Sequence, residues 1–249
     1  MVLGVRSRAM ATFVLVHGAW GGGWVWGRVA PLLESAGHRV DALDLPGHGD
    51  SPAPVSEMTL DANARRVVER VEAAGEPVVL VGHSMGGMSV TQAAEFVPER
   101  IATLVYLTAF LPGNGQSLVQ LAEGDPATLV GPNLVIDEAA GSCLMNDDAV
   151  WEACFGECSE EDARWAAAQL VPESLAVMTA PVRITEERAG AVPRVYIECL
   201  RDRAIGIAKQ RQMWAARPCA QVFTLDTDHS PLLSRPEETA DLLLGLAAG

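Results

Sequence analysis

Ser84 stands in the run Gly82-His83-Ser84-Met85-Gly86, which matches the pattern G-x-S-x-G. In that pattern a serine occupies a tight turn between a strand and a helix, and the glycines allow backbone packing that a β-carbon would block. A serine hydroxyl is a weak nucleophile at neutral pH unless a neighbouring base takes its proton during attack. Because the motif is short and the chain holds 23 glycines, it needs support from a base, an acid and the surrounding elements.

The base must come from five histidines, namely His17, His38, His48, His83 and His229. His83 adjoins the serine, so its side chain must point elsewhere, and His38 begins a strand at the opposite edge of the sheet. His17 and His48 lie in loops at the carboxyl ends of strands and could approach the serine, but we interpret both as loop-stabilising residues. His229 is the only histidine after the serine and closely follows a predicted strand, so the sequence favours it as the base.

An acid must hold the imidazole in the correct tautomer and stabilise its charged form. In the chain order serine, acid, histidine, it lies between Ser84 and His229 at the end of a strand. Asp202, just past a predicted strand, fits that place. Asp226 and Asp228 are rivals, but both are so near His229 in sequence that they would struggle to reach its ring. The sequence therefore predicts Ser84, Asp202 and His229 as nucleophile, acid and base.

The developing oxyanion of an attacked carbonyl needs two hydrogen-bond donors. The turn after the serine supplies one, the backbone N–H of Met85. The loop after the first strand, His17-Gly18-Ala19-Trp20, offers the other as the N–H of Ala19. This glycine-rich loop contains neither G-x-G-x-x-G nor G-K-[ST], so a nucleotide-binding role is disfavoured.

The elements that must position these groups alternate between short β-rich runs and helical patterns, as in parallel strands joined by crossover helices. Strands are predicted at residues 12–17, 38–43, 77–81, 101–107, 194–200 and 220–225. Helices are predicted at about 24–36, at 59–74, from the serine turn to about 97, and at 236–247. We therefore predict an α/β fold with a mostly parallel central sheet of about six strands flanked by helices.

The segment 111–188 breaks this rhythm, with no clear strand, several prolines and glycines, and scattered helical patterns. So long a stretch exceeds an ordinary loop of a compact domain. We interpret residues 111–188 as an inserted, mainly helical cap over the carboxyl ends of the strands, between the core segments 12–110 and 189–249. Residues 1–11 are expected to be a short disordered leader, or the product of an upstream start with Met10 as the alternative initiator.

Acidic residues outnumber basic ones by 32 to 18, which gives a formal net charge of −14. Such a charge repels phosphate backbones and anionic lipids, so we expect no nucleic acid and no membrane among the partners. Residues 101–163 hold eleven of the acids and no lysine or arginine. The excess charge therefore belongs mainly to the cap, which we interpret as a solvated face, while the core is close to neutral.

Cysteine use indicates the compartment. The five cysteines are Cys143, Cys154, Cys158, Cys199 and Cys219. They are sparse, odd in number and without metal-ligand spacing, which is typical of free thiols in a reducing compartment. We expect a cytoplasmic protein that needs no metal and no organic cofactor. Its single lysine, many arginines and abundant alanine are associated with a GC-rich bacterial genome.

The segments VLVHGAWGGGWVW, ALDLPGHGDS, VLVGHSMGG, RVYIECLRD and DHSPLLSRPEE resemble the α/β-hydrolase superfamily. With TEERAGAVPRVYI at the exit of the cap, they are most similar to the branch of plant methylesterases, hydroxynitrile lyases and bacterial pyrethroid-hydrolase-like carboxylesterases. The resemblance runs from about residue 12 to the C-terminus. It implies a triad of Ser84, Asp202 and His229 and an oxyanion hole of Ala19 and Met85, which agrees with the assignment from the residues.

That branch contains both hydrolases and lyases. The lyases that this chain resembles typically carry a threonine in place of Gly18 and a lysine in place of Ser230, and this lysine is the cation beside the departing cyanide. We therefore expect a serine carboxylesterase that hydrolyses neutral hydrophobic esters through an acyl-enzyme. Aromatic, pyrethroid-like or methyl esters are implied by the resemblance. A cyanohydrin-cleaving lyase and a non-catalytic small-molecule binding protein on the same fold are the alternatives.

The expected partner is a small-molecule ester. Gly18 leaves room for its carbonyl to reach the two backbone donors, and Trp20 lies in the same loop. Phe110 and Leu111 follow the fourth strand where the cap begins, and Trp151 lies within the cap. We expect these five residues to contact the substrate.

Overall fold

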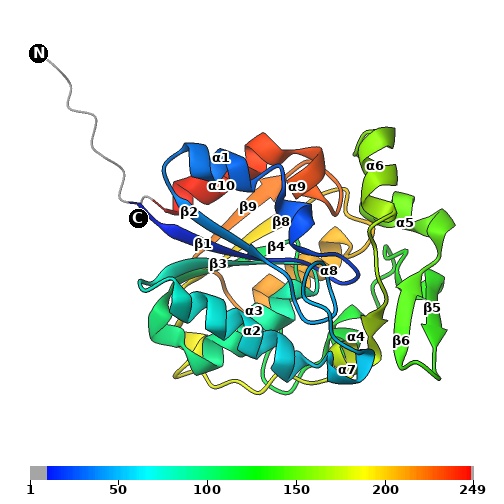
Figure 1. Ribbon diagram of the computed structural model, residues 1–249, viewed down its shortest axis with the longest axis horizontal. Coiled ribbons are helices and arrows are strands. Elements are labelled where there is room, and N and C mark those ends of the chain that lie inside the picture. Colours follow the sequence, from blue (N-terminus) through cyan, green and yellow to red (C-terminus); the bar gives the residue numbers. More distant parts are fainter. Residues whose placement is uncertain (1–9, 248–249) are drawn as a thin grey trace, which may run out of the picture.

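The computed structural model describes residues 10–247 of the chain (Figure 1). A six-stranded parallel sheet has the order β2-β1-β3-β4-β8-β9. Its strands are β1 (Thr12–Val16), β2 (Arg39–Leu43), β3 (Val78–His83), β4 (Ile101–Leu107), β8 (Arg194–Cys199) and β9 (Gln221–Leu225). All six predicted strands are present close to their expected bounds, which confirms the α/β class.

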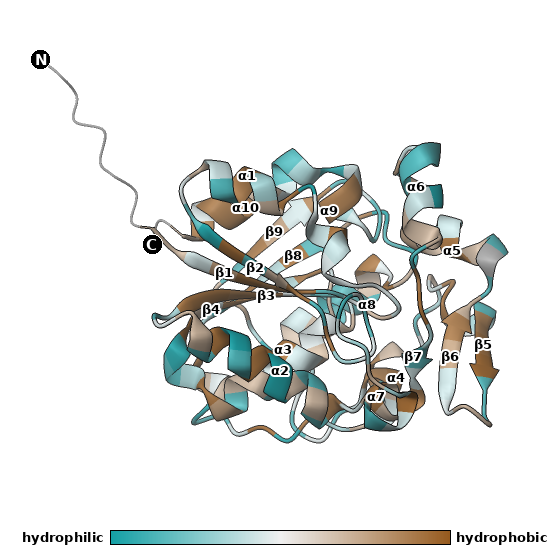
Figure 2. Cartoon of the chain, viewed as in Figure 1, coloured by the Kyte–Doolittle hydropathy of each residue, from teal (hydrophilic) through white to brown (hydrophobic). Residues whose placement is uncertain are grey.

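Helices cover both faces of this sheet (Figure 1). They are α1 (Ala30–Ser35) and α10 (Pro236–Leu246) on one face, and α2 (Leu60–Ala73) and α3 (Gly86–Phe96) on the other. In β1 the side chains of Phe13 and Leu15 join the cluster with α1 and α10, whereas Val14 and Val16 join the cluster with α2 and α3. The central strands β1, β3 and β4 are mostly apolar because both faces are covered, and they are brown between the helical layers in Figure 2, whereas the edge strands β2 and β9 are partly exposed.

The helix predicted at residues 24–36 is interrupted. A 3₁₀ helix at Gly23–Trp26 comes first, and α1 begins at Ala30 with Pro31 in its first turn. Proline lacks the N–H that an interior helical position would donate, but it fits the first turn, so it starts a new helix.

Two helices near the carboxyl ends of β8 and β9 were not predicted, α8 (Ile207–Ala216) and α9 (Pro231–Ser234). In α8 only Gln210 and Met213 are buried. A helix without an apolar stripe gives no periodic signal in the sequence.

The segment 111–188 lies beyond the carboxyl ends of the parallel strands (Figure 1). It contains α4 (Leu118–Ala122), β5 (Leu134–Asp137), β6 (Ser142–Met145), α5 (Asp147–Cys154), α6 (Glu160–Ala167), β7 (Glu173–Ser174) and α7 (Leu175–Thr179). The expectation that this segment has no strand is wrong, because β5, β6 and β7 form an antiparallel sheet. These strands are too short for an alternating pattern to reveal them.

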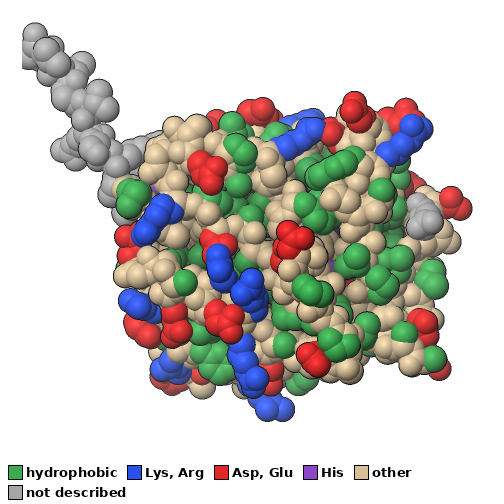
Figure 3. Space-filling model, viewed as in Figure 1, with side chains coloured by type: hydrophobic (Ala, Val, Ile, Leu, Met, Phe, Trp, Pro, Cys, Tyr) green, Lys and Arg blue, Asp and Glu red, His purple; other side chains and the backbone are tan. Residues whose placement is uncertain are grey.

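The acidic side chains of this segment are not all simply solvated. Four of them pair with arginines of the core, in the pairs Asp162–Arg28, Glu152–Arg203, Glu157–Arg201 and Glu186–Arg217. In each pair at least one of the two side chains is about half exposed or more, so each pair contributes at most about 1 kcal/mol. Acidic and basic side chains also lie next to one another over the core on the face shown in Figure 3.

At the start of the described residues, Ala11 is held at the edge of the sheet. Its N–H donates to Nδ1 of His38 at 3.2 Å, and its carbonyl accepts the N–H of Arg39 at 3.0 Å. Residues 1–9, the rest of the predicted leader, lie outside the described residues. Within residues 10–247, no helix combines the length and the apolar composition needed to cross a membrane.

Candidate active site

Ser84 occupies a sharp turn between β3 and α3. Its φ of +54° is unusual for a residue with a side chain, and such backbone strain costs about 1–3 kcal/mol. The turn is tight because two glycines flank it. A β-carbon on Gly82 would lie 2.9 Å from the backbone of Gly86, and one on Gly86 would lie 2.6 Å from the carbonyl oxygen of His17. The local sequence therefore makes the turn that presents the serine hydroxyl at the end of the strand.

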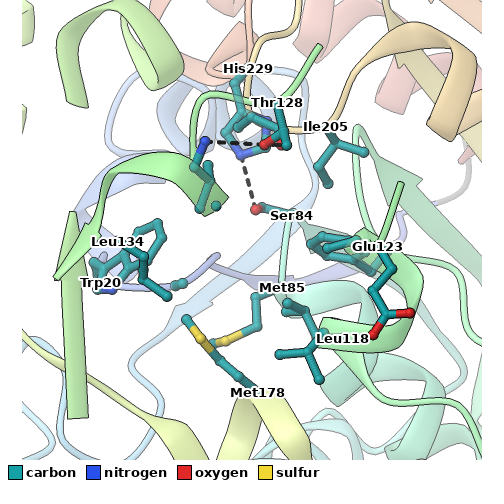
Figure 4. Close-up of a pocket in the computed structure, with 17 residues that line it drawn as sticks. Trp20, Ser84, Met85, Leu118, Glu123, Thr128, Leu134, Met178, Ile205 and His229 are labelled. Atoms are coloured by element: carbon teal, nitrogen blue, oxygen red, sulfur yellow. Dashed lines mark hydrogen bonds between the residues drawn. The ribbon is translucent and has the colours of Figure 1, made fainter. Parts of the chain in front are cut away.

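The structure brings Ser84, His229 and Asp202 together, and Figure 4 shows the contact between Ser84 and His229. Oγ of Ser84 lies 2.9 Å from Nε2 of His229, and Nδ1 of His229 lies 2.7 Å from Oδ2 of Asp202. His229 follows β9 and Asp202 follows β8, so both reach the site from loops at the carboxyl edge of the parallel sheet. A base hydrogen-bonded to a hydroxyl, with a carboxylate behind it, can take the hydroxyl proton during attack.

Asp202 is buried and fixed by four further donors. Its Oδ1 accepts the backbone N–H groups of Ala204 at 2.7 Å and Ile205 at 2.8 Å. Its Oδ2 accepts the hydroxyl of Thr108 and, at 3.4 Å, the amide of Gln210. These donors fix the orientation of the carboxylate whose Oδ2 faces Nδ1 of His229.

The two rival acids do not contact the imidazole. Asp226 is exposed and pairs with Arg201, and Asp228 accepts the backbone N–H of Glu157 at 2.9 Å. Their short separation from His229 in sequence directs both side chains away from its ring.

His17 orients the peptide that joins Gly18 to Ala19. Its Nδ1–H donates to the carbonyl of Gly18 at 2.7 Å, and its Nε2 accepts the N–H of Leu45 at 3.1 Å. Burial, together with the charge of His48, lowers the pKa of His17 to about 3, so this neutral tautomer persists. Because the Gly18 carbonyl and the Ala19 N–H belong to one peptide unit, the hydrogen bond from His17 also sets the direction of the Ala19 amide.

The two predicted oxyanion donors border the same cavity as the nucleophile. Ala19, Ser84 and Met85 all line it, and neither the Ala19 nor the Met85 amide donates a hydrogen bond to another described residue. A β-carbon on Gly18 would lie 2.7 Å from Cβ of Ser84, so the glycine keeps the nucleophile unobstructed. The arrangement can receive the oxygen of a tetrahedral intermediate.

His83 points away from the nucleophile, as predicted. Burial, and then the neighbouring His229, lower the pKa of His83 to about 3, so it is neutral. Its Nε2–H donates to the backbone carbonyl of His229 at 2.8 Å. His83 therefore fixes the backbone that carries the base.

Two cavities meet at Ser84, one of about 290 Å³ and one of about 50 Å³. The larger is almost entirely apolar, and Trp20, Leu118, Leu134 and Met178 surround it in Figure 4. Glu123, an exposed residue, is the only acidic, lysine or arginine side chain that lines either cavity within the described part of the chain.

The predicted substrate contacts are placed unequally. Trp20 borders both cavities, Gly18 borders the smaller one and Phe110 the larger one. Leu111 and Trp151 border neither. Leu111 is packed in the core and faces a separate polar cavity beside α8, and Trp151 packs against the cluster on the other face of the sheet.

Most of the larger cavity is formed by residues that the sequence did not identify. From the cap the hydrophobic side chains among them are Leu118, Val119, Ala122, Val130, Leu134 and Met178. The first three belong to α4, whose capping box joins Ser117 and Gln120. The spacing S-x-x-Q is a helix-start signature and could have located this helix.

The parallel sheet, the strained turn at Ser84 and the serine–histidine–aspartate relay define an α/β-hydrolase. Residues 13–242 match the Alpha/beta hydrolase family, and the chain belongs to that family. The resemblance predicted from the sequence is thereby confirmed.

Several relatives are similar over nearly the whole chain. Salicylic acid-binding protein 2 of Nicotiana tabacum is 35% identical over 94% of this chain and 96% of its own. Polyneuridine aldehyde esterase of Rauvolfia serpentina is 32% identical over 97% of both chains, and a crystal structure of polyneuridine aldehyde esterase has a TM-score of 0.85 over 96% of this chain and 99% of its own. A pyrethroid hydrolase from Sphingobium faniae JZ-2 has a TM-score of 0.86 at 29% identity, over 96% of this chain and 98% of its own.

These relatives support the predicted class of ester-hydrolysing hydrolases. The relatives of highest sequence identity reported above are plant proteins, so they lend no support to the bacterial source that composition indicated.

Proposed function

We propose that this protein is a serine carboxylesterase that hydrolyses neutral, hydrophobic esters through an acyl-enzyme. The observation that carries the proposal is the hydrogen-bonded relay from Ser84 through His229 to Asp202 at the junction of two apolar cavities. No lysine or arginine side chain lines either cavity within the described residues, so a substrate carboxylate would find no permanently charged cation there.

The reaction has two halves. Oγ of Ser84 attacks the ester carbonyl while Nε2 of His229 takes its proton, and the N–H groups of Ala19 and Met85 hold the oxyanion. His229 then gives this proton to the departing alcohol, and the acyl group stays on Ser84. A water molecule, deprotonated by His229, then attacks the acyl carbon, and the bond to Oγ of Ser84 breaks as His229 returns the proton to Oγ, which releases the carboxylic acid and restores the serine.

The unequal cavities favour an asymmetric ester. A space of about 290 Å³ accommodates a bulky apolar group, whereas one of about 50 Å³ accommodates only a few heavy atoms. Methyl esters of large acids fit this division. Extended aromatic esters also fit it if one aromatic group fills the larger cavity and the rest of the molecule extends toward solvent past Glu123, the exposed residue that lines it. The names of the methylesterase and pyrethroid hydrolase relatives add support for esters of these two kinds.

Replacing the nucleophile tests the proposal directly. Ser84→Ala is expected to lower kcat for a p-nitrophenyl ester by at least about 10⁴-fold and to abolish labelling by a fluorophosphonate. Ser89→Ala is the matched control, because Ser89 is buried in α3, the helix that follows the Ser84 turn, has no hydrogen-bond partner among the described residues and borders neither cavity. Ester hydrolysis that survives in Ser84→Ala would exclude the mechanism.

The same assays separate the alternatives. A lyase would cleave mandelonitrile faster than it turns over esters, and a binding protein with a disassembled triad would leave the fluorophosphonate unreacted. The cation that a lyase of this branch carries is replaced by Ser230, which is buried, and this disfavours the lyase.

A cytoplasmic location is part of the proposal. All five cysteines are free, and Cys143, Cys154 and Cys199 are buried. Free thiols are typical of reducing compartments.

A further inference from the structure

A buried ion pair joins the cap to the core. Nε2 of His48, in the loop after β2, lies 3.1 Å from Oε2 of Glu173 in β7, and the side chains are 1% and 0% exposed. Each of the other cap-to-core ion pairs described above has at least one side chain that is about half exposed or more. A carboxylate removed from water needs a partner that compensates its charge. Loss of one partner of this buried pair is therefore expected to destabilise the protein more than loss of a surface pair.

His48 is placed to carry a proton on both nitrogens. Its Nδ1 lies 3.1 Å from the carbonyl of Pro46, and its Nε2 faces the Glu173 carboxylate, so acceptors lie on both sides of the ring. Burial alone would lower the pKa of His48, but Glu173, Pro46 and Asp44 together raise it above its ordinary value of 6.5. The contact between Nε2 of His48 and Oε2 of Glu173 lacks the alignment of a hydrogen bond, and Oε2 has no other partner among the described residues. The interaction that stabilises this carboxylate oxygen is therefore electrostatic attraction to the charged imidazole.

The pair adjoins the loop that holds a predicted oxyanion donor. The ring of His48 lies 5.0 Å from the ring of His17, which orients the peptide between Gly18 and Ala19. The charge of His48 contributes to keeping His17 neutral, in the tautomer whose Nδ1–H donates to the carbonyl of Gly18.

The cap also forms hydrogen bonds to Trp20, the residue after Ala19 in the oxyanion loop. The carbonyl of Trp20 accepts the N–H of Val171 at 2.9 Å, and the indole N–H of Trp20 donates to the carbonyl of Cys143 in β6 at 3.0 Å. Trp20 itself has a φ of +62°, a strained conformation that its surroundings must maintain. The position of β6 and β7 therefore bears on the conformation of the oxyanion loop.

We propose that Glu173 is a positioning residue, which binds the protonated side chain of His48 and so holds the cap against the oxyanion loop in its active conformation. Neither residue borders the cavities at Ser84, so both act through the loop and not on the substrate. The proposal rests on the proposed esterase function, because the oxyanion loop matters through the reaction that it supports.

The pair makes activity depend on pH in a defined direction. The titratable or charged groups that face it are Asp44 in the loop of His48, His17 in the oxyanion loop, and Cys143 in β6 beside Glu173. A group whose pKa is raised by folding contributes stability that is complete below its ordinary pKa of 6.5 and is lost as the pH rises through the raised value. Once His48 loses its proton, the Glu173 carboxylate is buried without a cation, and the cap is held less firmly.

Glu173→Gln separates charge from shape. The new amide oxygen can still accept the N–H of Ser174, which Glu173 accepts now at 2.9 Å, and the new amide N–H can donate to Nε2 of a neutral His48. We expect this variant to lose the alkaline decline in kcat and to acquire a decline at acid pH, where a protonated His48 would face an amide donor. Glu160→Gln, in an exposed cap ion pair with Arg164, is the matched control and is expected to keep the wild-type profile.

His48→Gln tests the pair from the other side. It leaves the Glu173 carboxylate buried without a cation at every pH, so kcat is expected to fall by at least about tenfold while KM changes by less than about threefold, because an oxyanion donor acts on the transition state. The double variant His48→Gln with Glu173→Gln removes the uncompensated charge and is expected to recover most of kcat, which a double-mutant cycle records as coupling.

The experiment measures kcat, KM and the unfolding temperature of these variants between about pH 4 and pH 10, so that both the acid and the alkaline side of each profile are covered. An alkaline decline of the same midpoint in wild type and Glu173→Gln overturns the proposal. A variant whose unfolding temperature changes while its kcat profile does not move shows a purely structural pair, which also overturns the positioning role. If the wild type hydrolyses no ester, the proposed function fails, while a fall in unfolding temperature with pH that Glu173→Gln removes still establishes the pair.

Discussion

Asp202→Asn is the substitution whose effect the structure specifies most closely. The new side chain has one oxygen and one NH₂ group, and five donors surround the native carboxylate. An NH₂ group at the place of Oδ1 would face the backbone N–H groups of Ala204 and Ile205, which cannot turn away. The amide oxygen therefore takes that place, and the NH₂ group takes the place of Oδ2 beside His229.

An NH₂ donor beside Nδ1 of His229 moves the imidazole proton to Nε2. The proton then lies between Nε2 and Oγ of Ser84, so the histidine can no longer accept the serine proton. The loss of the correct tautomer lowers kcat by about 10⁴-fold, or about 5.5 kcal/mol in the activation free energy, with the fold retained.

The assay is kcat for a p-nitrophenyl ester at neutral pH, together with the unfolding temperature. Asp226→Asn is the control, since Asp226 is exposed and pairs only with Arg201, and its kcat is expected to stay within about twofold of wild type. A loss of less than about tenfold in Asp202→Asn would refute the tautomer argument and the assignment of the acid.

Three further predictions concern the surroundings of the triad. His17→Phe removes the donor that orients the oxyanion peptide, so kcat is expected to fall by about 10-fold to 10³-fold with a smaller change in KM. Gly87→Ala would place a β-carbon 2.1 Å from the carbonyl oxygen of Phe110, and calorimetry should show an unfolding temperature lower by about 2–10 °C, whereas Gly245→Ala, in open space on α10, should raise it slightly. Ala122→Trp fills part of the larger cavity and is expected to lower kcat/KM for bulky esters at least about tenfold while sparing p-nitrophenyl acetate, so equal losses for both esters would contradict the assignment of this cavity.

The core of the fold followed from the sequence because its signals are local. The central strands are buried on both faces and appear as apolar runs, and helix α2 has its cap at Thr59 and its stop at Gly75, which has a φ of +75°. The acid and the base could be placed because parallel strands end at the same edge, so a residue just past β8 and one just past β9 must lie near each other.

The cap could not be predicted to the same depth. Its strands are two to four residues long, and α4 and α7 are only slightly longer, so periodicity over such lengths carries little information. Leu111 and Trp151 were expected at the substrate from their positions in sequence alone. Which side chains reach a cavity depends on how short elements pack against one another, and that packing has no local signature.

The sequence by itself determined the nucleophile turn, the order of the triad and the parallel sheet, because each depends on residues close together in the chain or on the common direction of parallel strands. Only the tertiary structure decided the two cavities at Ser84 and the pairing of His48 with Glu173. These features arise where the cap meets the core, between residues far apart in sequence. Whether a charged side chain is buried, and which group compensates its charge, depends on such long-range contacts and cannot be read from the neighbouring sequence.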